Sequence, residues 1–593
     1  MKKLNGGKTD DAILHRLFRK GELSFALSDL AQAVGPIVDL MFVSLFIGAS
    51  GVTVMGYVSP LVMILGLIGS CIATGARIKV STLLGAGKLD EANTVFSASV
   101  MLGLAVSVIT AIVIGIFCSE VSLILGAKEP QILAMTRLYI LGYLIGLPFL
   151  SIARLLIPYL QMEGQYGIVS TTSMLITIID IALDAFVVFV LHGGMFELAL
   201  ATSLGYVIPS CMRAAFFMRR KNPSVFRLSL KGITPAICYD IVRLGVPTCV
   251  LRGSNSAAGV LINNLLTALN MRYLVAAYGV FAQITVFVRS SWFAASDTLA
   301  SFTGIFIGEE DKASLMETQK ITLLHSLLCT CTIAVLLFVF AEPLTGLFLK
   351  SNDPEALRMG VECIRISCLS LPFHTIVYGF SQYLMVLKRI RFCNIYNFLL
   401  ECGSIVPITF LMLQVIGYQG AWASKVINMM VLSAIAVFYI SKNSVRGGGY
   451  RDKMLLMPDD FGIPPENEIV FSAASSDEII DLSKLAVAFA LEHGADRNRA
   501  KTYGLVTEEL AGVLTEHGFS DGKTHNINAR LVAKGEELII RMRDDCKPFN
   551  LTEYYMKVRE DIEQGVGMSI IMKKSKDVQY TNTLGTNNLI VRI

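Results

Sequence analysis

Long apolar runs dominate the chain from about Gln32 to Ile440, and short polar loops separate them. A helix that spans a bilayer needs about 20 mainly apolar residues. The pattern contains twelve runs of roughly that length, so we expect an all-α membrane part of about twelve transmembrane helices. Their centres are expected near Val38, Ile64, Val106, Leu147, Ile179, Leu204, Val250, Val286, Val335, Leu371, Ile405 and Leu432.

The pattern changes after about Ser441, where Lys, Asp, Glu and Asn become frequent. Amphipathic helices are expected over residues 476–492 and 499–517. The segments NINARLVAKGEELIIRMRDD and TNTLGTNNLIVRI alternate apolar and polar residues around a turn, which predicts two β-hairpins. We therefore expect a C-terminal α/β sandwich domain over 465–593, joined by a glycine-rich, flexible linker over 444–464.

Composition supports a membrane class. The chain is 53% hydrophobic and 17% charged, whereas soluble domains carry about 25% charged residues. The net charge of +4 gives no reason to expect a nucleic-acid partner. The twelve cysteines lie mainly in apolar segments without zinc-like spacing, so no metal site is expected from them. The N-terminus, Met1 to Lys20, has no signal-peptide apolar core.

Lys and Arg gather in alternate loops, and this fixes the expected orientation. They occur before the first span and at Lys88, 219–221, 388–391 and 442–453, all of which fall on one face if the spans alternate. The loops between these, such as 117–131 and 192–197, hold few. By the positive-inside rule, both termini and the polar C-terminal domain are expected on the cytoplasmic side of the cell membrane.

The membrane part contains an internal repeat. Pro130 with Pro354, and Pro148 with Pro372, are both separated by 224 residues, and LLGAGKLDEA at 83–92 is similar to FIGEEDKA at 306–313. Two six-helix lobes, over residues 1–225 and 226–443, are therefore expected. Two such bundles suit alternating access around a central cleft. An old duplication in a membrane scaffold without transport is the alternative.

An ordered set of segments resembles the multidrug and toxic compound extrusion (MATE) family. It consists of GPIVDLMFVSLFIG at 35–48, SCIATGARIKVSTLLGAGKLDEA at 70–92, IIDIALDAFVVF at 178–189 and the two LPF corners. The resemblance covers roughly residues 15–445. It implies twelve helices in two lobes and efflux driven by a sodium or proton gradient, and it leaves the cargo open.

Three acidic residues lie inside expected spans. Asp39 follows Pro36 by three residues, and proline removes a helical hydrogen bond. Asp180 and Asp184 are four apart and share a helix face. Because a charge in mid-bilayer costs roughly 2.5 kcal/mol or more, such residues are functional candidates. We expect Asp39, Asp180 and Asp184 to form a site for a proton or sodium ion. The alternative is a structural role near a boundary or beside a basic residue.

The second half carries a different set. Arg252 and Arg289 lie in the expected seventh and eighth spans, and Asn397 and Glu401 are four apart in the eleventh. We expect these four residues to line a substrate cleft. Some family members have an acid in the seventh span, where this chain has Arg252 and Asn255, so a second sodium site is not expected. Arginines in a cleft would favour an anionic or zwitterionic cargo, unless they snorkel to an interface or pair internally.

The C-terminal domain resembles the histidine-kinase-like ATPase fold, in its anti-sigma-factor serine kinase branch. The resemblance rests on TEELAGVLTEHGF at 507–519, RDDCKPFN at 543–550, GVGMSIIMKK at 565–574 and LGTNN at 584–588. It implies that Glu509 is a catalytic base, that Asp544 accepts the adenine amino group, and that Gly565 and Gly567 let backbone N–H groups approach phosphates. ATP or another adenine nucleotide is the implied ligand.

Two departures from this pattern bear on catalysis. Val513 stands at the position of a magnesium-binding asparagine, and valine offers no oxygen ligand. Cys546 replaces a glycine beside the adenine position. Nucleotide binding without turnover, a purely structural or partner-docking fold, and an ATP-dependent serine kinase activity therefore all stay open.

Three functions fit the sequence. The leading hypothesis is a secondary active exporter of small organic compounds with a cytoplasmic domain that senses a nucleotide or a protein partner. The alternatives are a flippase for lipid-linked precursors and a membrane-tethered signalling protein that controls a transcription regulator. A primary ATP pump is not expected, because the chain has no GxxxxGK[ST] phosphate loop.

Overall fold

The computed structural model describes residues 6–219, 224–269, 271, 273–348, 354–443, 450–458, 460–473, 476–518, 527–546, 554–556 and 565–593. Within these residues, eleven helical segments are long and apolar enough to cross a membrane. They are Leu14–Ile47, Ala49–Gly85, Leu89–Ile116, Pro130–Met162, Tyr166–Leu191, Met195–Met218, Leu274–Gly308, Lys312–Val339, Pro354–Val386, Ile390–Ile416 and Gln419–Asn443. The expected helical membrane part is confirmed.

The first half of the membrane part runs from α1 to α9. Proline or glycine at several helix ends and short π turns divide some spans into two elements. The helices are α1 (Gly6–Phe42), α2 (Ala49–Gly85), α3 (Leu89–Ile116), α4 (Cys118–Ile124), α5 (Pro130–Leu155), α6 (Ile157–Met162), α7 (Tyr166–Phe186), α8 (Met195–Gly205) and α9 (Val207–Met218).

The second half runs from α10 to α19, and its spans are divided at other points than those of the first half. Its helices are α10 (Pro235–Ala268), α11 (Leu274–Val288), α12 (Ser290–Gly308), α13 (Lys312–Val339), α14 (Ala341–Phe348), α15 (Pro354–Ser367), α16 (Leu371–Val386), α17 (Ile390–Phe398), α18 (Ile405–Ile416) and α19 (Gln419–Asn443). A short helix, α20 (Tyr450–Met454), follows.

Helix α10 lies where the seventh of twelve spans was expected, yet it is not among the eleven apolar segments. It has 34 residues, which is more than enough to cross a bilayer. Arg252 and the polar run that follows it, including Asn255, dilute its apolar character. By length and composition, the described chain therefore offers eleven spans where the pattern predicted twelve.

Equivalent segments of the two halves match in length. The third segment of the first half and Lys312–Val339 both have 28 residues, and Pro130–Met162 and Pro354–Val386 both have 33. The next pairs have 26 and 27 residues, then 24 and 25. Pro130 and Pro354 each begin a helix, as the repeat predicted. The duplication read from the prolines thus extends to the lengths of the helices.

The C-terminal domain, called the tail domain below, is a five-stranded antiparallel sheet with helices. The strand order is β1-β2-β3-β5-β4. The elements are β1 (Glu468–Ala473), α21 (Ser476–Glu492), α22 (Arg497–Gly518), β2 (Ile527–Lys534), β3 (Glu537–Asp544), α24 (Gly565–Lys574), β4 (Asp577–Thr583) and β5 (Thr586–Arg592). Both predicted hairpins are confirmed, β2 with β3 and β4 with β5.

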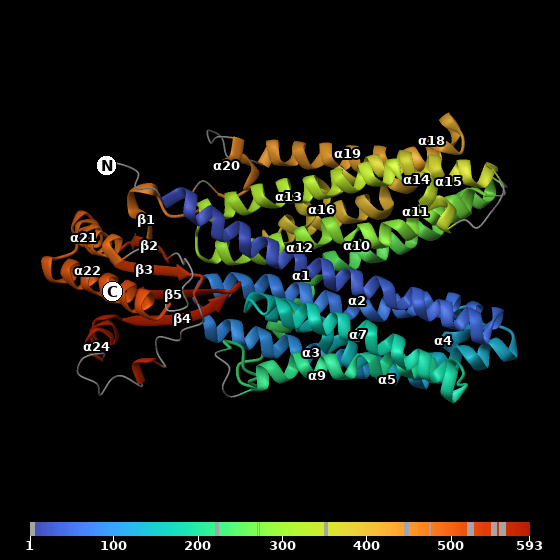
Figure 1. Cartoon of the computed structure of the whole chain (residues 1–593), viewed down its shortest axis with the longest axis horizontal. Helices are drawn as coiled ribbons and strands as arrows, with labels where there is room; N and C mark the ends of the chain where they lie inside the picture. Colours follow the sequence, from blue (N-terminus) through green and yellow to red (C-terminus); the bar gives the residue numbers. More distant parts are fainter. Residues whose placement is uncertain are drawn as a thin grey trace.

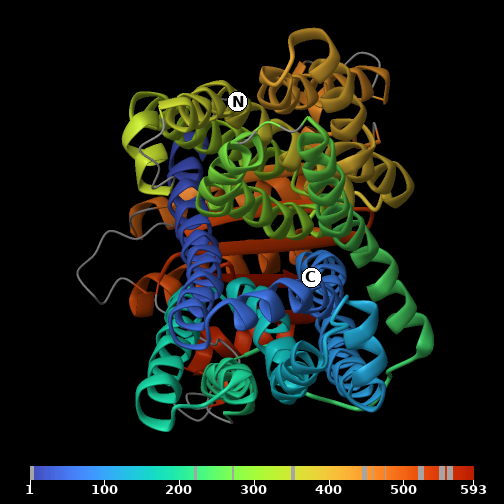
Figure 2. The same cartoon turned by 90° about the vertical axis from the view of Figure 1, so that its right-hand side faces the viewer.

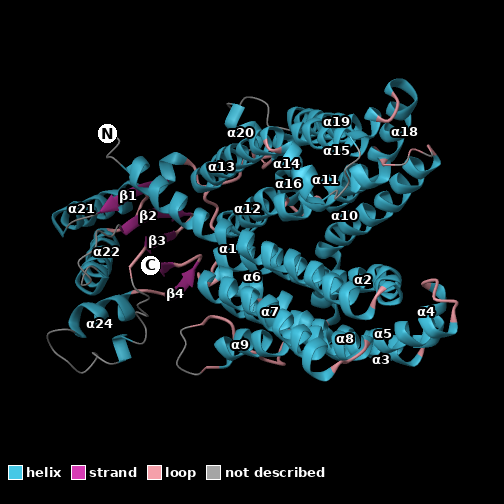
Figure 3. Ribbon diagram, turned by 45° about the vertical axis from the view of Figure 1, so that its right-hand side comes forward, coloured by secondary structure: helices cyan, strands magenta, loops and turns pink. Residues whose placement is uncertain are grey.

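The sheet of the tail domain is covered on both faces. Alternate residues, such as Leu531, Ile540 and Val591, pack with α21, α22 and α24 in one hydrophobic core. The residues between them face the membrane helices, and seven consecutive residues of β2 are buried. Figure 3 shows the strands lying between the tail helices and the ends of the membrane helices. The outward positions of the hairpins are therefore not a solvent-facing surface.

The two halves of the membrane part lie beside each other, and the tail domain lies across one end of both (Figures 1 and 2). We call this end the tail side and the opposite end the far side. Contacts between the halves are made mainly by α2 with α10 and α12, and by α1 with α12. These four helices therefore form the junction between the halves.

Glycines allow the junction helices to approach closely. A Cβ atom on Gly75 of α2 would lie 1.9 Å from the carbonyl oxygen of Ile241, and one on Gly245 of α10 would lie 2.0 Å from that of Cys71. Backbone atoms cannot yield to a side chain there, so only glycine fits. The thiols of Cys71 and Cys249, one from each half, lie within hydrogen-bonding range of each other.

Ion pairs also join the halves at this junction. Arg77 of α2 donates to Asp297 of α12 with Nη1 to Oδ1 at 2.9 Å, and its Nη2 lies 3.3 Å from Oε1 of Gln382 on α16. Lys79 of α2 pairs with Asp240 of α10 at 2.7 Å. In each pair the cation comes from the first half and the anion from the second, so the halves are electrostatically complementary here.

Candidate functional site

Helices α1 and α7 position the three candidate aspartates. Thr177 of α7 donates to the carbonyl oxygen of Ala31 on α1 at 2.8 Å, which holds the helices in register. Pro36 lies inside α1 one turn before Asp39. Each helix continues into a π turn, Val43–Ile47 after α1 and Val187–Leu191 after α7. Such turns leave backbone groups outside the regular helical pattern and often occur at functional sites.

The structure brings Asp39, Asp180 and Asp184 together. One carboxylate oxygen from each lies within 4.8 Å of the others. Asp180 and Asp184 are buried, with 6% and 1% of their surface exposed. Each of the three also has a buried oxygen, Oδ1, without a hydrogen-bond partner. Buried acceptors without partners are rare in proteins. These three oxygens are therefore able to accept a proton or to bind a cation.

No basic side chain balances this charge among the described residues, because none of the three aspartates takes part in a recorded ion pair there. Two tyrosines are among the described neighbours of the cluster. Tyr139 and Tyr143 of α5 lie within electrostatic range of the aspartates. Oδ2 of Asp180 lies close to Gly35 of α1, because a Cβ atom at that position would be only 3.3 Å from it. Three carboxylates this close repel unless a positive charge or a shared proton stands between them.

Arg252 and Arg289 belong to a second group of charges, at the boundary between the halves. Arg252 of α10 is exposed, and it lies within electrostatic range of Arg154 and Asp29 from the first half and of Arg289 and Asp297 from the second. Arg154 donates to the carbonyl oxygen of Gly66 at 2.9 Å. Together with Arg77, which pairs with Asp297, four arginines face two aspartates. The boundary therefore carries a net positive charge.

Asn397 and Glu401 have hydrogen-bond partners within the second half, and Glu401 also lies within electrostatic range of Arg252. Asn397 is fully buried and donates to the carbonyl oxygen of Pro247 at 3.0 Å, while Ser381 donates to its Oδ1 at 2.5 Å. Glu401 accepts from Nδ2 of Asn255 at 2.7 Å and from the hydroxyl of Tyr378.

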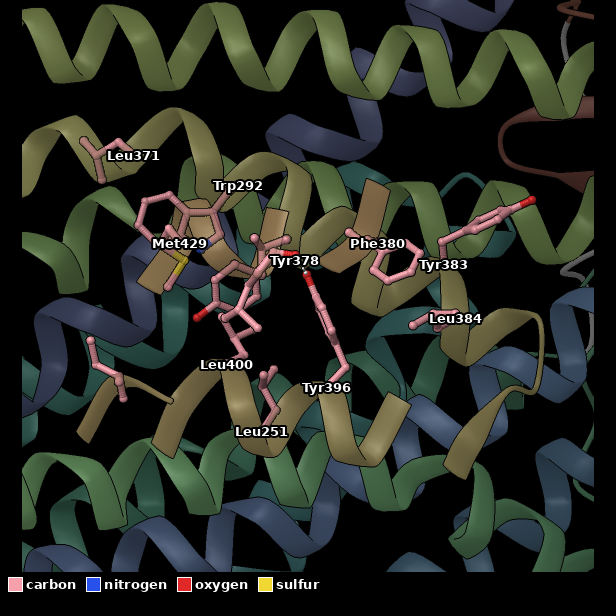
Figure 4. Close-up of a cluster of buried hydrophobic side chains, with 14 of the residues drawn as sticks. Leu251, Trp292, Leu371, Tyr378, Phe380, Tyr383, Leu384, Tyr396, Leu400 and Met429 are labelled. Atoms are coloured by element: carbon pink, nitrogen blue, oxygen red, sulfur yellow. Dashed lines mark hydrogen bonds between the residues drawn. The ribbon is translucent and has the colours of Figure 1, made fainter. Parts of the chain in front are cut away.

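Tyr378 and Leu400, the residue before Glu401, lie with Trp292 and Leu251 in the hydrophobic core of the second half (Figure 4). Both polar groups thus have partners inside this half, so the expectation that Asn397 and Glu401 line a cleft stays a prediction.

In the tail domain, Asp544 is the candidate residue with the most defined surroundings. It ends β3, is 1% exposed, and accepts from Asn587 at 2.7 Å and from the backbone N–H of Cys546 at 3.0 Å. Burial raises the pKa of Asp544. One carboxylate oxygen of Asp544 thus accepts both hydrogen bonds. The bond from the N–H of Cys546 is local in the chain and gives Asp544 a structural role.

The other predicted nucleotide residues are only partly described. Glu509 lies on α22, where burial and then Glu508 raise its pKa. Val513 packs against the core of the tail domain. Gly565 and Gly567 form the first turn of α24. Residues 547–550 of the segment RDDCKPFN lie outside the described residues.

Three residues of the boundary escaped the sequence reading, namely Asp29, Arg154 and Arg77. All three lie in apolar spans. The rule that flagged Asp39 would have flagged them as well, since any ionisable residue within a span is a candidate. Tyr139 and Tyr143 gave no such signal, because only the packing of α5 brings them near the aspartates.

Comparison with known proteins extends the picture for the membrane part. The family model MatE matches residues 25–186 and 257–411. The multidrug export protein MepA of Staphylococcus saprophyticus is 22% identical over 432 residues, 72% of this chain and 94% of that protein. MepA of Staphylococcus aureus is 22% identical over 427 residues, 71% of this chain and 92% of that protein.

Solved structures share the fold. The Vibrio cholerae MATE transporter VcmN in its bent form gives a TM-score of 0.68 at 17% identity, covering 73% of this chain and 98% of that one. A MOP superfamily transporter of Pyrococcus furiosus gives 0.67 at 18% identity, covering 74% and 98%. Because the family model matches more than half of the residues and the multi-pass helical architecture agrees, this chain belongs to the MatE family of multidrug efflux transporters.

Proposed function

We propose that the protein is a secondary active antiporter that exports small organic compounds from the cytoplasm and is driven by a proton or sodium gradient. The observation that supports it is the cluster of Asp39, Asp180 and Asp184, which has unpartnered buried oxygens and no recorded basic partner among the described residues. An ion that enters and leaves this cluster would change its charge and so bias the packing of α1 against α7.

The architecture of this proposal is two lobes of six spans each, with α10 as the twelfth span. Helix α10 has 34 residues, enough to cross a bilayer, and it begins the second half as α1 begins the first. Both termini are then on the same side of the membrane. The loop charges favour the cytoplasm for that side, so the tail domain would be cytoplasmic.

The test is transport by the purified full chain in proteoliposomes under separately imposed proton and sodium gradients. We expect cargo movement against its own gradient with one of the two ions, and its collapse when that gradient is dissipated. A fluorescent organic dye serves as the first cargo. Transport that ignores both gradients would contradict the antiport proposal.

The arginines at the boundary favour a cargo that carries an anionic group. Hydrogen bonds from arginine to carboxylate or phosphate are charge-assisted and typically strong. Arg252 is the most accessible of the boundary arginines. The same chemistry suits an organic carboxylate, a zwitterion or the phosphate of a lipid-linked precursor, and these possibilities are distinguished by offering each as a competitor.

Arg252→Gln is expected to raise the half-saturating concentration of an anionic cargo by about tenfold, because one charged hydrogen bond contributes roughly 1.5 kcal/mol. The measurement is competition for dye transport by an aromatic carboxylate and by a quaternary ammonium compound of similar size. Arg243→Gln, on the same helix and exposed, is the matched control. Equal affinity of both competitors for the wild type and for Arg252→Gln would contradict an anion site.

The tail domain is proposed to regulate this transport by binding a nucleotide or a protein partner. Asp544 supports this role by its place next to Arg543, which pairs with Glu309 of the membrane part. The two neighbours point to opposite faces of β3. A ligand held at Asp544 would therefore act one residue from a contact with the transporter.

A further inference from the structure

The face of the tail sheet that meets the membrane helices is rich in arginine. Arg530 and Arg541 are directly paired in the register of β2 with β3, and Arg543 follows two residues later on the same face. Arg530 is 6% exposed. Neighbouring guanidinium groups would repel each other without anionic partners. Glu468 of β1 pairs with Arg530 at 2.7 Å, and the membrane part supplies further acceptors from both of its halves.

The loop after α12 provides the partners from the second half. Arg543 donates to both carboxylate oxygens of Glu309, at 2.9 and 2.7 Å, and lies over the ring of Phe306. Arg530 donates to the backbone carbonyls of Glu309 and Glu310, both at 3.0 Å. Because a helix carries partial negative charge at its C-terminal end, cations are favoured just beyond α12.

The charged groups around this loop shift one another's pKa values. Burial would lower the pKa of Arg530, but Glu468, Asp311 and Glu309 together raise it. Burial would raise the pKa of Asp311, but Arg530, Ser314 and Arg543 lower it. Both groups therefore stay charged in the interface. Lys534 adds an exposed pair with Glu310 at 2.7 Å, which contributes little by itself.

The first half is held by backbone contacts and by an ion pair between Arg16 of α1 and Asp545, the residue after β3. Arg541 donates to the carbonyl oxygen of Gly85, the last residue of α2, at 3.3 Å. The turn between β4 and β5 reaches the loop after α6, where the N–H of Leu584 donates to the carbonyl oxygen of Met162 at 2.5 Å. At this loop a Cβ on Gly164 would lie 2.2 Å from the Cα of Gly585, so the two backbones touch.

The two loops that the tail sheet contacts, one after α2 and one after α12, are equivalent in the internal repeat. LLGAGKLDEA at 83–92 runs from the end of α2 into α3, and FIGEEDKA at 306–313 runs from the end of α12 into α13. These are the two similar segments of the halves. One rigid sheet thus binds the same loop in each half, directly beyond the junction formed by Arg77 with Asp297 and Gly245 with Cys71.

We propose that the arginine face of the tail sheet is a clamp that holds the two halves together and stabilises the state closed on the tail side. Opening on that side must move the loop after α2 away from the loop after α12. The sheet can follow one loop only, so the contacts with the other are lost. The tail domain therefore opposes opening on the tail side, and this effect does not depend on the cargo.

The consequence for transport rests on the proposed alternating access, but the clamp itself can be measured without cargo or ion gradient. The thiols of Cys71 and Cys249 report closure, since they come from different halves and lie within hydrogen-bonding range. The assay is the rate of their disulfide formation with copper phenanthroline in the full-length protein, followed by mass spectrometry of the linked peptides. Cys71→Ser identifies the background.

Arg543→Glu is expected to slow this cross-link by about tenfold, because it replaces a bidentate charged contact by a repulsion. Glu309→Gln, which leaves the tail sequence intact, should slow it in the same direction and by less. The charge-swapped pair Arg543→Glu with Glu309→Arg should recover most of the rate. Lys484→Glu reverses an exposed charge on α21, away from the membrane helices, and should leave the rate unchanged.

Two results would overturn the clamp. One is an unchanged cross-linking rate in both Arg543→Glu and Glu309→Gln. The other is a loss in Arg543→Glu that the charge swap does not recover, since this would mean a folding defect. Neither result depends on whether the protein transports by antiport, so failure of the clamp and failure of the proposed function are told apart.

Discussion

Replacing Asp39 with asparagine is expected to abolish gradient-driven transport while the amount of folded protein in the membrane stays normal. Asparagine has nearly the same shape as aspartate but neither ionises nor attracts a cation. The cluster then keeps Asp180 and Asp184, which share α7, and loses the only carboxylate contributed by α1. Ion binding can no longer link the two helices, and transport should fall below about a tenth of the wild-type rate.

The measurement is cargo accumulation in proteoliposomes under the active gradient, with protein amount checked by size-exclusion chromatography in detergent. Glu120→Gln, an exposed carboxylate on α4 of the same half, is the control for charge removal and should transport normally. Downhill movement of cargo without a gradient separates loss of coupling from loss of cargo binding. Wild-type accumulation by Asp39→Asn would remove Asp39 from the coupling site.

Much of the site could be predicted because its signal is local. An acid in an apolar run is conspicuous wherever it occurs, and spacing of four residues places Asp180 and Asp184 on one face. That α1 packs against α7, and so brings Asp39 to the pair, depends on tertiary contacts such as Thr177 with Ala31. No local pattern encodes such a contact. The resemblance to a known family supplied what the pattern could not.

The tail domain shows the opposite case. Its hairpins follow from alternation and from turn residues, and Leu584 and Gly585 take the positive φ that a two-residue turn needs. The alternation also makes Arg530, Arg541 and Arg543 look like a solvent-facing set. Their partners are backbone carbonyls and Glu309, more than 200 residues away, together with Glu468 on the neighbouring strand β1. The alternation of apolar and polar residues along a strand is the same whether the polar face of the sheet contacts water or the ends of helices.

The internal repeat could also be predicted from local sequence signals, but the junction between the halves could not. Prolines and short similar segments mark equivalent positions, and helix lengths follow them. The junction between the halves is not marked by the repeat, because it uses glycines that look like ordinary membrane residues. Gly75 and Gly245 stand out only when the helix axes are known.

Gly245→Ala is expected to impair closure on the tail side and to slow transport by about tenfold or more. The added methyl group would lie 2.0 Å from the carbonyl oxygen of Cys71 and 2.8 Å from its sulfur. Helices α2 and α10 must then separate by roughly 1 Å, and overpacking of this kind costs about 1–3 kcal/mol. Alanine favours the helix itself, so α10 is not weakened.

Gly253→Ala on the same helix is the matched control, because nothing lies within 4 Å of its added Cβ. It should transport like the wild type, and the cross-link between Cys71 and Cys249 should form at the normal rate. In Gly245→Ala the same cross-link should slow together with transport, since both need α2 and α10 in contact. If Gly245→Ala transported normally while the cross-link slowed, close approach of these helices would not belong to the transport cycle, and the closed junction would be only a resting arrangement.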